Sequence, residues 1–255
     1  MSNIDYIGRA KERMSSRGAS WVQAEDKFLI AEALAPSLLT RLQASISETN
    51  SASLIVSGGS TPAPVFKALS GADIDWSRVL VTLADERWVP PGHADSNESL
   101  VRDTLMVDKA ASAKFVSLYR PDISPDQALG SITADVKAMG SPFTAVVLGM
   151  GNDGHTASLF PDAPEQELVA AMDLNSTDTV MMMHPPSVPQ ARITLTRAAL
   201  LNAKHRYLHI TGEQKCQVLC DAVGNDPGAR YQAGMAPVTG LLLESPESVS
   251  VYWSP

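Results

Sequence analysis

Short apolar runs alternate with amphipathic stretches along most of this chain, and this alternation restricts the possible folds more than any other feature. The apolar runs have the length of buried strands and lie at 54–56, 79–83, 116–118, 145–148, 180–183, 207–210 and 249–252. Stretches with helical spacing fall between them, at 63–69, 97–105, 125–139 and 213–223. Strands that alternate with helices form a mostly parallel sheet with helices on both faces. The sequence therefore predicts a doubly wound α/β fold.

The 255 residues predict one α/β domain that follows a short leader. Residues 1–20 are mostly small and polar, and we expect a leader here that need not be ordered. Residues 21–255 contain no internal repeat and no linker rich in Pro, Gly or Ser, so a single domain is the simpler prediction. Within it, residues 26–49 have helical spacing interrupted by Pro36, which predicts a kinked or split helix.

The charge balance argues against a nucleic-acid partner, because 20 Lys and Arg face 28 Asp and Glu, a net charge of −8, without any basic run. A small anionic ligand would need cations gathered locally. No apolar run approaches the ~20 residues that span a bilayer, and no signal peptide is recognisable, so we expect a cytoplasmic protein with no membrane partner. Cys216 and Cys220 lie four apart in a predicted helix, which favours two buried apolar groups over a disulfide or a zinc site.

In an open parallel sheet, ligands bind beyond the carboxyl ends of the strands, so a site is expected just after the apolar runs. The first such loop is Ser57-Gly58-Gly59-Ser60-Thr61-Pro62. Its glycines let backbone amides approach an anion, its hydroxyls can donate hydrogen bonds, and a helix that opens at the proline adds favourable potential. A phosphate cradle and a tight turn with a hydroxyl cap fit these residues equally well. The loop is not a P-loop, because no Gly-Lys-Ser/Thr follows.

The second loop begins with Asp85, Glu86 and Arg87, three consecutive ionisable residues at the end of an apolar run. Charged residues at a strand end are often only solvated. Here, however, they lie at the edge where ligands bind, and Trp88 with two following prolines would stiffen the loop that presents them. We therefore favour a functional role for this triplet.

The third loop, residues 149–161, is the most informative stretch of the chain. Its glycines at 149, 151 and 154 follow a strand and match the dinucleotide pattern G-x-G-x-x-G. A nicotinamide enzyme would also need a full helix after the third glycine and an acidic residue at the end of the next strand. Instead Pro161 interrupts the helix, and the next apolar run ends at Met183 and His184. The dinucleotide interpretation is therefore a minor alternative.

The same loop contains Asp153-Gly154-His155, a carboxylate two residues from an imidazole. An imidazole can act as a base near neutral pH while a carboxylate fixes its orientation. We find no nucleophile elbow and no metal-binding motif, so water is the expected nucleophile, and neither metal nor cofactor is expected. Cations for a phosphate are available at Arg192 and Lys215, with Arg197 and Lys204 as alternatives.

These residues resemble the 6-phosphogluconolactonase family, within the wider group that includes glucosamine-6-phosphate deaminase. The resemblance extends from about Ala24 to Tyr252 and is carried by the motifs at 57–62, 85–87, 95–97, 151–161, 192–196 and 211–215. Deaminases of the group typically have tyrosine after the Asp-Glu pair and continue from Gly-His into Ile-Ala-Phe-Asn-Glu-Pro. This chain has Arg87 and Thr-Ala-Ser-Leu-Phe-Pro instead, which is the lactonase pattern.

The resemblance implies hydrolysis of 6-phospho-D-glucono-1,5-lactone, the second step of the oxidative pentose phosphate pathway. It implies that His155 activates water, that Asp153 orients the imidazole and that Arg87 stabilises the developing oxyanion or the carboxylate product. The glycine loop, Arg192 and Lys215 would hold the phosphate, with Asp85 and Glu86 arranging their loop or binding sugar hydroxyls. Alternatives are an amino-sugar phosphate deaminase or aldose-ketose isomerase, and a non-catalytic sugar-phosphate sensor. The sequence does not fix the oligomeric state, and a monomer would suffice.

Overall fold

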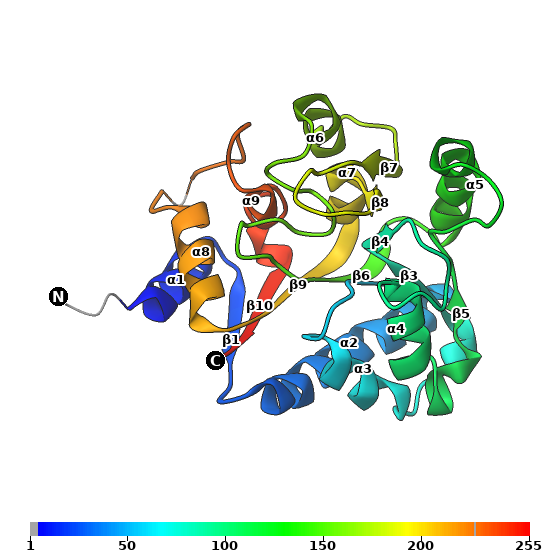
Figure 1. The fold of residues 1–255 in the computed structure, drawn as a ribbon. Helices are drawn as coiled ribbons and strands as arrows, with labels where there is room; N and C mark the ends of the chain where they lie inside the picture. The colour runs from blue at the N-terminus through cyan, green and yellow to red at the C-terminus, as the bar shows by residue number, and fades with distance from the viewer. Residues whose placement is uncertain (1–4, 227) are drawn as a thin grey trace.

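A parallel sheet of seven strands forms the centre of the computed structural model, which describes residues 5–226 and 228–255 (Figure 1). The strand order is β1-β10-β9-β6-β2-β3-β5, and every neighbouring pair is parallel. The strands are β1 (Ser20–Gln23), β2 (Ala52–Val56), β3 (Val79–Leu83), β5 (Lys114–Phe115), β6 (Phe143–Leu148), β9 (Ala203–Thr211) and β10 (Val249–Ser254). The strand predicted at 116–118 therefore lies slightly earlier in the chain.

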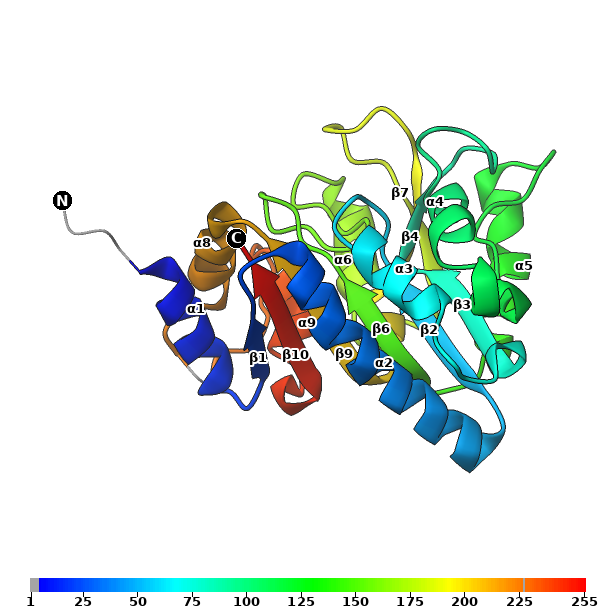
Figure 2. The ribbon, with the colours of Figure 1, turned by 90° about the horizontal axis from the view of Figure 1, so that it is seen from below.

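Helices cover both faces of this sheet, which confirms the predicted doubly wound α/β fold. Figure 1 shows α2 and α3 below the sheet and α7 and α9 above it, and Figure 2, seen from below, shows α2 crossing in front of the strands. The helices are α1 (Tyr6–Ser15), α2 (Lys27–Thr49), α3 (Ala63–Ser70), α4 (Asn97–Thr104), α5 (Pro125–Ala138), α6 (Glu165–Met172), α7 (Arg197–Leu201), α8 (Glu213–Val223) and α9 (Pro237–Leu242). No helix of the described residues combines the length and apolar character needed to cross a membrane.

The central strands are buried along their whole length, as expected for a sheet covered on both faces. Every residue of β2 and β6 is buried, and these strands belong to a continuous core cluster. Helix α2 starts where the carboxylate of Asp26 accepts the backbone N–H groups of Phe28 and Leu29, at 2.7 and 2.9 Å. It then continues unbroken past Pro36, so the prediction of a split helix is wrong. Pro36 is exposed, and water can reach the carbonyl that the proline leaves unbonded.

A second, antiparallel sheet lies beside the first and brings distant parts of the sequence together. Its order is β4-β8-β7, with β4 at Asp85–Arg87, β8 at Arg192–Leu195 and β7 at Val180–Met183. The run at 180–183 was expected in the parallel sheet, and the structure places it here instead. Strand β4 follows β3 after one residue, so this small sheet carries the Asp85–Arg87 loop toward β8.

At the N-terminus, the described part of the leader contains helix α1. Ala10 and Met14, one helical turn apart, are fully buried, and α1 packs against α8. Arg17 adds polar anchors, since its guanidinium donates to the carbonyl oxygens of Val223 at 2.7 Å and Asp226 at 2.5 Å. The packing of α1 against α8 could not be predicted from the polar composition of the segment, because polar arginine side chains make the contacts at the end of α8.

Candidate active site

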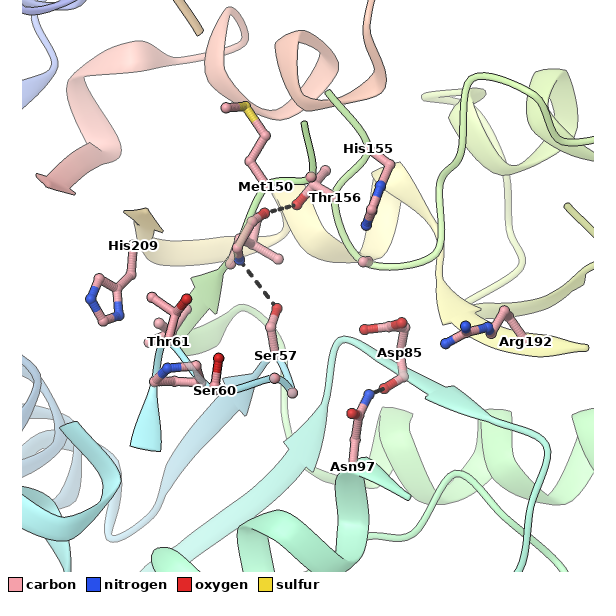
Figure 3. Close-up of a pocket in the computed structure, with 18 of the residues that line it drawn as sticks. Ser57, Ser60, Thr61, Asp85, Asn97, Met150, His155, Thr156, Arg192 and His209 are labelled. Carbon is pink, nitrogen blue, oxygen red and sulfur yellow. Dashed lines mark hydrogen bonds between the residues drawn. The ribbon is translucent and has the colours of Figure 1, made fainter. Parts of the chain in front are cut away.

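A pocket of about 430 Å³ opens at the carboxyl ends of β2, β6 and β9, beside the small antiparallel sheet (Figure 3). Ligands of open α/β sheets bind at this edge, so its position agrees with the sequence prediction. Most of the predicted site residues line it, namely Ser57, Gly58, Gly59, Ser60, Thr61, Asp85, Arg87, His155, Arg192 and Lys215. The structure thus collects residues that lie more than 150 positions apart in the sequence.

The glycine loop is held in place by contacts that leave no room for a side chain at Gly58. A Cβ atom there would lie 1.8 Å from Oδ1 of Asn97. The amide of Asn97 in turn donates to the carbonyl oxygen of Asp85 at 3.0 Å, so the loop after β2 and the residues of β4 are locked together. No described side chain caps the N-terminus of α3, which leaves the first amides of that helix available to an anion.

The imidazole of His155 is paired with the carboxylate of Asp153. His155 Nδ1 lies 2.6 Å from Asp153 Oδ1, and the same oxygen accepts the backbone N–H of His155 at 3.1 Å. The ring stacks on Phe160, with centroids 4.1 Å apart. A Cβ at Gly151 would lie 2.2 Å from Nδ1, so this glycine is required for the pair to form. The arrangement fixes Nδ1 against the carboxylate and leaves Nε2 for chemistry in the pocket.

Asp85 and Glu86 are adjacent in sequence but have different environments. Asp85 lines the pocket and accepts a hydrogen bond of 2.6 Å from the hydroxyl of Ser158. Its buried carboxylate is therefore oriented by a protein donor while remaining next to the space for substrate.

Glu86 is buried and lies outside the set of described residues that line the pocket. Its carboxylate accepts the backbone N–H groups of Arg87, Asn97 and Glu98 at 2.7 to 2.9 Å, and the hydroxyl of Ser96 at 3.1 Å. Burial nevertheless raises the pKa of this carboxyl above its ordinary value. Of the two roles predicted for Glu86, its position favours arranging the loop and the start of α4 over binding sugar hydroxyls.

Two arginines face each other across the antiparallel sheet, because Arg87 in β4 and Arg192 in β8 are register partners. Arg87 donates to the carbonyl oxygen of Asp95 at 2.6 Å, while the Nε atoms of both arginines lack a partner among the described residues. Burial, followed by the charge of Arg87, lowers the pKa of Arg192. The carboxylates of Asp85, Glu86 and Asp95 act on Arg192 in the opposite direction. The two unpartnered Nε–H groups leave donors that suit an anion.

Lys215 belongs to the other end of the pocket. It lies in the first turn of α8, which begins directly after β9 and Gly212. Burial lowers the pKa of its amine. The charge of Lys215 acts on His209, whereas the charges that act on Arg192 are those of Arg87 and nearby carboxylates. The sequence grouped Arg192 and Lys215 on one phosphate. Both line this pocket, with Arg192 on the small antiparallel sheet and Lys215 at the start of α8.

The two alternative cations are engaged elsewhere. Arg197 forms a buried ion pair with Glu244 at 3.1 Å, and Lys204 lies 3.5 Å from Glu48 at the surface. Cys216 and Cys220 are buried free thiols in α8, as predicted. Among the residues that the structure describes, no cluster of three His, Cys, Asp or Glu side chains is arranged to hold a metal ion.

Sequence reasoning missed His209, which lines the pocket from the end of β9, and the ring of Phe160 behind His155. The rule that placed the other residues could have found His209, because it lies only two positions before the carboxyl end of its strand. The stacking role of Phe160 depends on the turn at 156–159, where Thr156 and Leu159 form an isolated bridge. Helix α6 begins only at Glu165, so the chain lacks the helix that a dinucleotide site requires directly after Gly154.

The fold and the pocket together define an α/β enzyme that binds a small anion beside an imidazole–carboxylate pair. The particular family is shown by comparison with known proteins. The chain belongs to the family described as glucosamine-6-phosphate isomerases/6-phosphogluconolactonase, whose model matches residues 25–253.

Individual relatives agree with this assignment. The chain is 42% identical over 225 residues to 6-phosphogluconolactonase of Pseudomonas aeruginosa, covering 88% of this chain and 90% of the relative. It is 39% identical over 231 residues to 6-phosphogluconolactonase of Rhizobium meliloti, covering 91% and 97%. A crystal structure of a 6-phosphogluconolactonase from Shewanella baltica is similar with a TM-score of 0.86 and 37% identity, covering 93% of this chain and 98% of that one.

Proposed function

We propose that this protein hydrolyses 6-phospho-D-glucono-1,5-lactone to 6-phospho-D-gluconate, the second step of the oxidative pentose phosphate pathway. Its relatives with 37% to 42% identity are 6-phosphogluconolactonases. The structural observation that carries the proposal is the 2.6 Å contact between His155 and Asp153 at the wall of a pocket with cationic side chains. Such a pair can deprotonate water beside an anionic substrate.

In this mechanism, Asp153 accepts the Nδ1–H of His155, and Nε2 removes a proton from a water molecule as its oxygen attacks the lactone carbonyl. The carbonyl becomes a tetrahedral oxyanion, and the imidazole becomes an imidazolium ion. When the ester C–O bond breaks, the imidazolium returns its proton to the departing ring oxygen, which becomes a hydroxyl. The products are a carboxylic acid, which ionises, and the regenerated enzyme.

The two cationic ends of the pocket give the substrate an orientation. The phosphate lies at the end formed by the glycine loop and Lys215, where backbone amides and an ammonium group can bind it. The lactone carbonyl lies toward Arg87 and Arg192, which stabilise the oxyanion and the carboxylate that replaces it. Asp85, whose carboxylate is oriented by the hydroxyl of Ser158, accepts a hydrogen bond from a hydroxyl group of the sugar.

These elements supply enough rate acceleration for a strained ester that already hydrolyses in water. General-base catalysis contributes roughly 10² to 10⁴ in rate, and one oxyanion donor contributes roughly 10² to 10³. The proposal includes action as a monomeric single domain in the cytoplasm. One chain provides every residue of the site, and the core cluster is continuous.

The decisive assay measures acid release from freshly generated 6-phosphogluconolactone against the spontaneous rate. We expect a large excess over that rate with the intact protein and its loss in His155→Ala, with folding preserved. Ammonia release from glucosamine 6-phosphate, measured in parallel, tests the deaminase alternative. Hydrolysis at the spontaneous rate would exclude the proposed activity, and an unchanged kcat in His155→Ala would exclude the base.

A further inference from the structure

His209 is a buried imidazole that has no hydrogen-bond partner among the residues described. The residue is 2% exposed, and neither Nδ1 nor Nε2 has a donor or acceptor within the described part of the chain. A buried polar group in this condition costs on the order of 1 to 3 kcal/mol. Leucine or methionine of similar volume would avoid that cost. The position therefore requires an explanation that involves something other than packing.

The ring lies at the pocket wall, where a ligand can supply the missing partner. His209 lines the same pocket as Thr61 and Lys215. Figure 3 shows His209 and Thr61 at one end of this pocket, with His155 and Arg192 toward the other. Residues two apart on a strand share a face, so His209 lies on the face of Tyr207, whose hydroxyl reaches Ser37 of α2 at 3.2 Å. The imidazole is thus held between the sheet, α2 and the glycine loop.

The protonation state of His209 suits a neutral donor beside a cation. Burial, and then the charge of Lys215, lower the pKa of His209 to about 4. The ring is therefore neutral near pH 7, with one N–H donor and one acceptor. A phosphate group accepts hydrogen bonds readily and compensates the charge of the neighbouring ammonium group. No other group of the substrate meets both requirements.

We propose that His209 is a phosphate-binding residue, and that its N–H donates a hydrogen bond to the substrate phosphate beside Lys215. This inference rests on the proposed function for the identity of the substrate, and it makes His209 a determinant of specificity for phosphorylated lactones. His209 takes no part in proton transfer, which belongs to His155 at the other end of the pocket. Its loss should therefore affect binding more than the chemical step.

The test measures binding of inorganic phosphate by calorimetry to the wild-type protein, His209→Leu and His209→Asn. Hydrogen bonds to charged groups are strong, so His209→Leu should weaken phosphate binding about tenfold or more. His209→Asn keeps an N–H donor and should recover part of the affinity. In the lactonase assay, His209→Leu should raise KM for the phosphorylated lactone while kcat changes little. KM for unphosphorylated gluconolactone should remain the same.

His205→Leu is the matched control, because His205 lies on the same strand and the same face as His209 but four residues earlier, ~13 Å from it along the strand. It should bind phosphate as the wild type does. Wild-type phosphate affinity in His209→Leu would overturn the assignment, even in an active lactonase. Conversely, a protein that binds phosphate through His209 but fails to open the lactone would refute only the proposed function.

A measurement on the unmodified protein covers the case in which His209→Leu does not fold. In protein labelled with ¹⁵N-histidine, addition of inorganic phosphate should shift the ring resonances of His209 and leave those of His205 in place. Saturation with phosphate without any shift of His209 would overturn the assignment.

Discussion

The pair formed by His155 and Asp153 can be separated into its charge and its geometry by two substitutions. In Asp153→Asn, the remaining Oδ1 can still accept both the Nδ1–H at 2.6 Å and the backbone N–H at 3.1 Å. Only the negative charge that stabilises the imidazolium ion is lost. Asp153→Ala removes both contacts and also frees the ring to rotate. The two variants should therefore differ in rate.

The expected magnitudes follow from the exposure of the pair. A hydrogen bond to a charged group is worth about 1.5 to 3 kcal/mol, and the side chains of His155 and Asp153 are 30% and 47% exposed, which favours the lower value. At 1.36 kcal/mol for each factor of ten, Asp153→Asn should lower kcat about tenfold. Asp153→Ala should lower kcat further, toward the roughly 10² to 10⁴ expected when the base itself is removed.

Initial rates of acid release, corrected for the spontaneous reaction, measure these differences. The matched control is Asp173→Asn, because Asp173 also accepts the backbone N–H two residues later, at 2.9 Å from Asn175, but its side-chain partner is the amide of Asn175 and not the imidazole of the active site. Its kcat should equal that of the wild type. A wild-type kcat in Asp153→Ala, or a slower reaction in Asp153→Asn than in Asp153→Ala, would refute the reasoning.

Three further predictions follow from the same structure. Gly151→Ala places a Cβ 2.2 Å from Nδ1 of His155 and should lower kcat at least tenfold. Gly130→Ala in α5 is the control, because a Cβ there meets no described atom within 4 Å. It should keep kcat and raise the free energy of unfolding by about 0.5 to 1 kcal/mol, measured with denaturant. Lys215→Ala should raise KM for the phosphorylated lactone far more than for the unphosphorylated one. Arg192→Ala should lower kcat for both lactones. The reverse pattern would mean that Arg192 binds the phosphate and Lys215 stabilises the oxyanion. The pKa of His209 is about 4 in the folded protein, below the ordinary value of 6.5. Above pH 6.5 the ring is neutral in both the folded and the unfolded state, but as pH falls toward 4 only the unfolded state takes up the proton. The wild type should therefore lose about 3 kcal/mol of stability relative to His209→Leu. Parallel curves of unfolding free energy against pH for the two proteins would contradict this.

The sequence allowed correct prediction of those features that depend on neighbouring residues. Short apolar runs predicted the buried strands, and the rule for ligand binding at their carboxyl ends located the loops at 57–62, 85–87 and 149–161. The contact between Asp153 and His155 spans two residues, so its possibility was visible in the sequence itself.

Features that depend on pairing between distant segments could not be predicted in this way. The register that places Arg87 opposite Arg192 joins residues 105 positions apart, and no periodicity in either segment reveals it. The capping role of Glu86 depends on where α4 begins in space, and the docking of α1 depends on carbonyl groups at the end of α8. The burial of His209 and its lack of a partner among the described residues likewise depend on the surrounding fold.

The proposed division of the cations into a phosphate-binding group and an oxyanion-binding group has a consequence for catalysis. The lactone carries one anionic group, its phosphate, whereas the transition state and the product carry a second negative charge on the former carbonyl. In the proposed mechanism, Lys215 therefore contacts a charge that is present throughout, and Arg87 with Arg192 contacts a charge that appears only during the reaction. An interaction that strengthens only in the transition state raises kcat, while one that is constant lowers KM. Arg87 and Arg192, whose Nε atoms have no partner among the described residues, are thus best satisfied when the oxyanion forms.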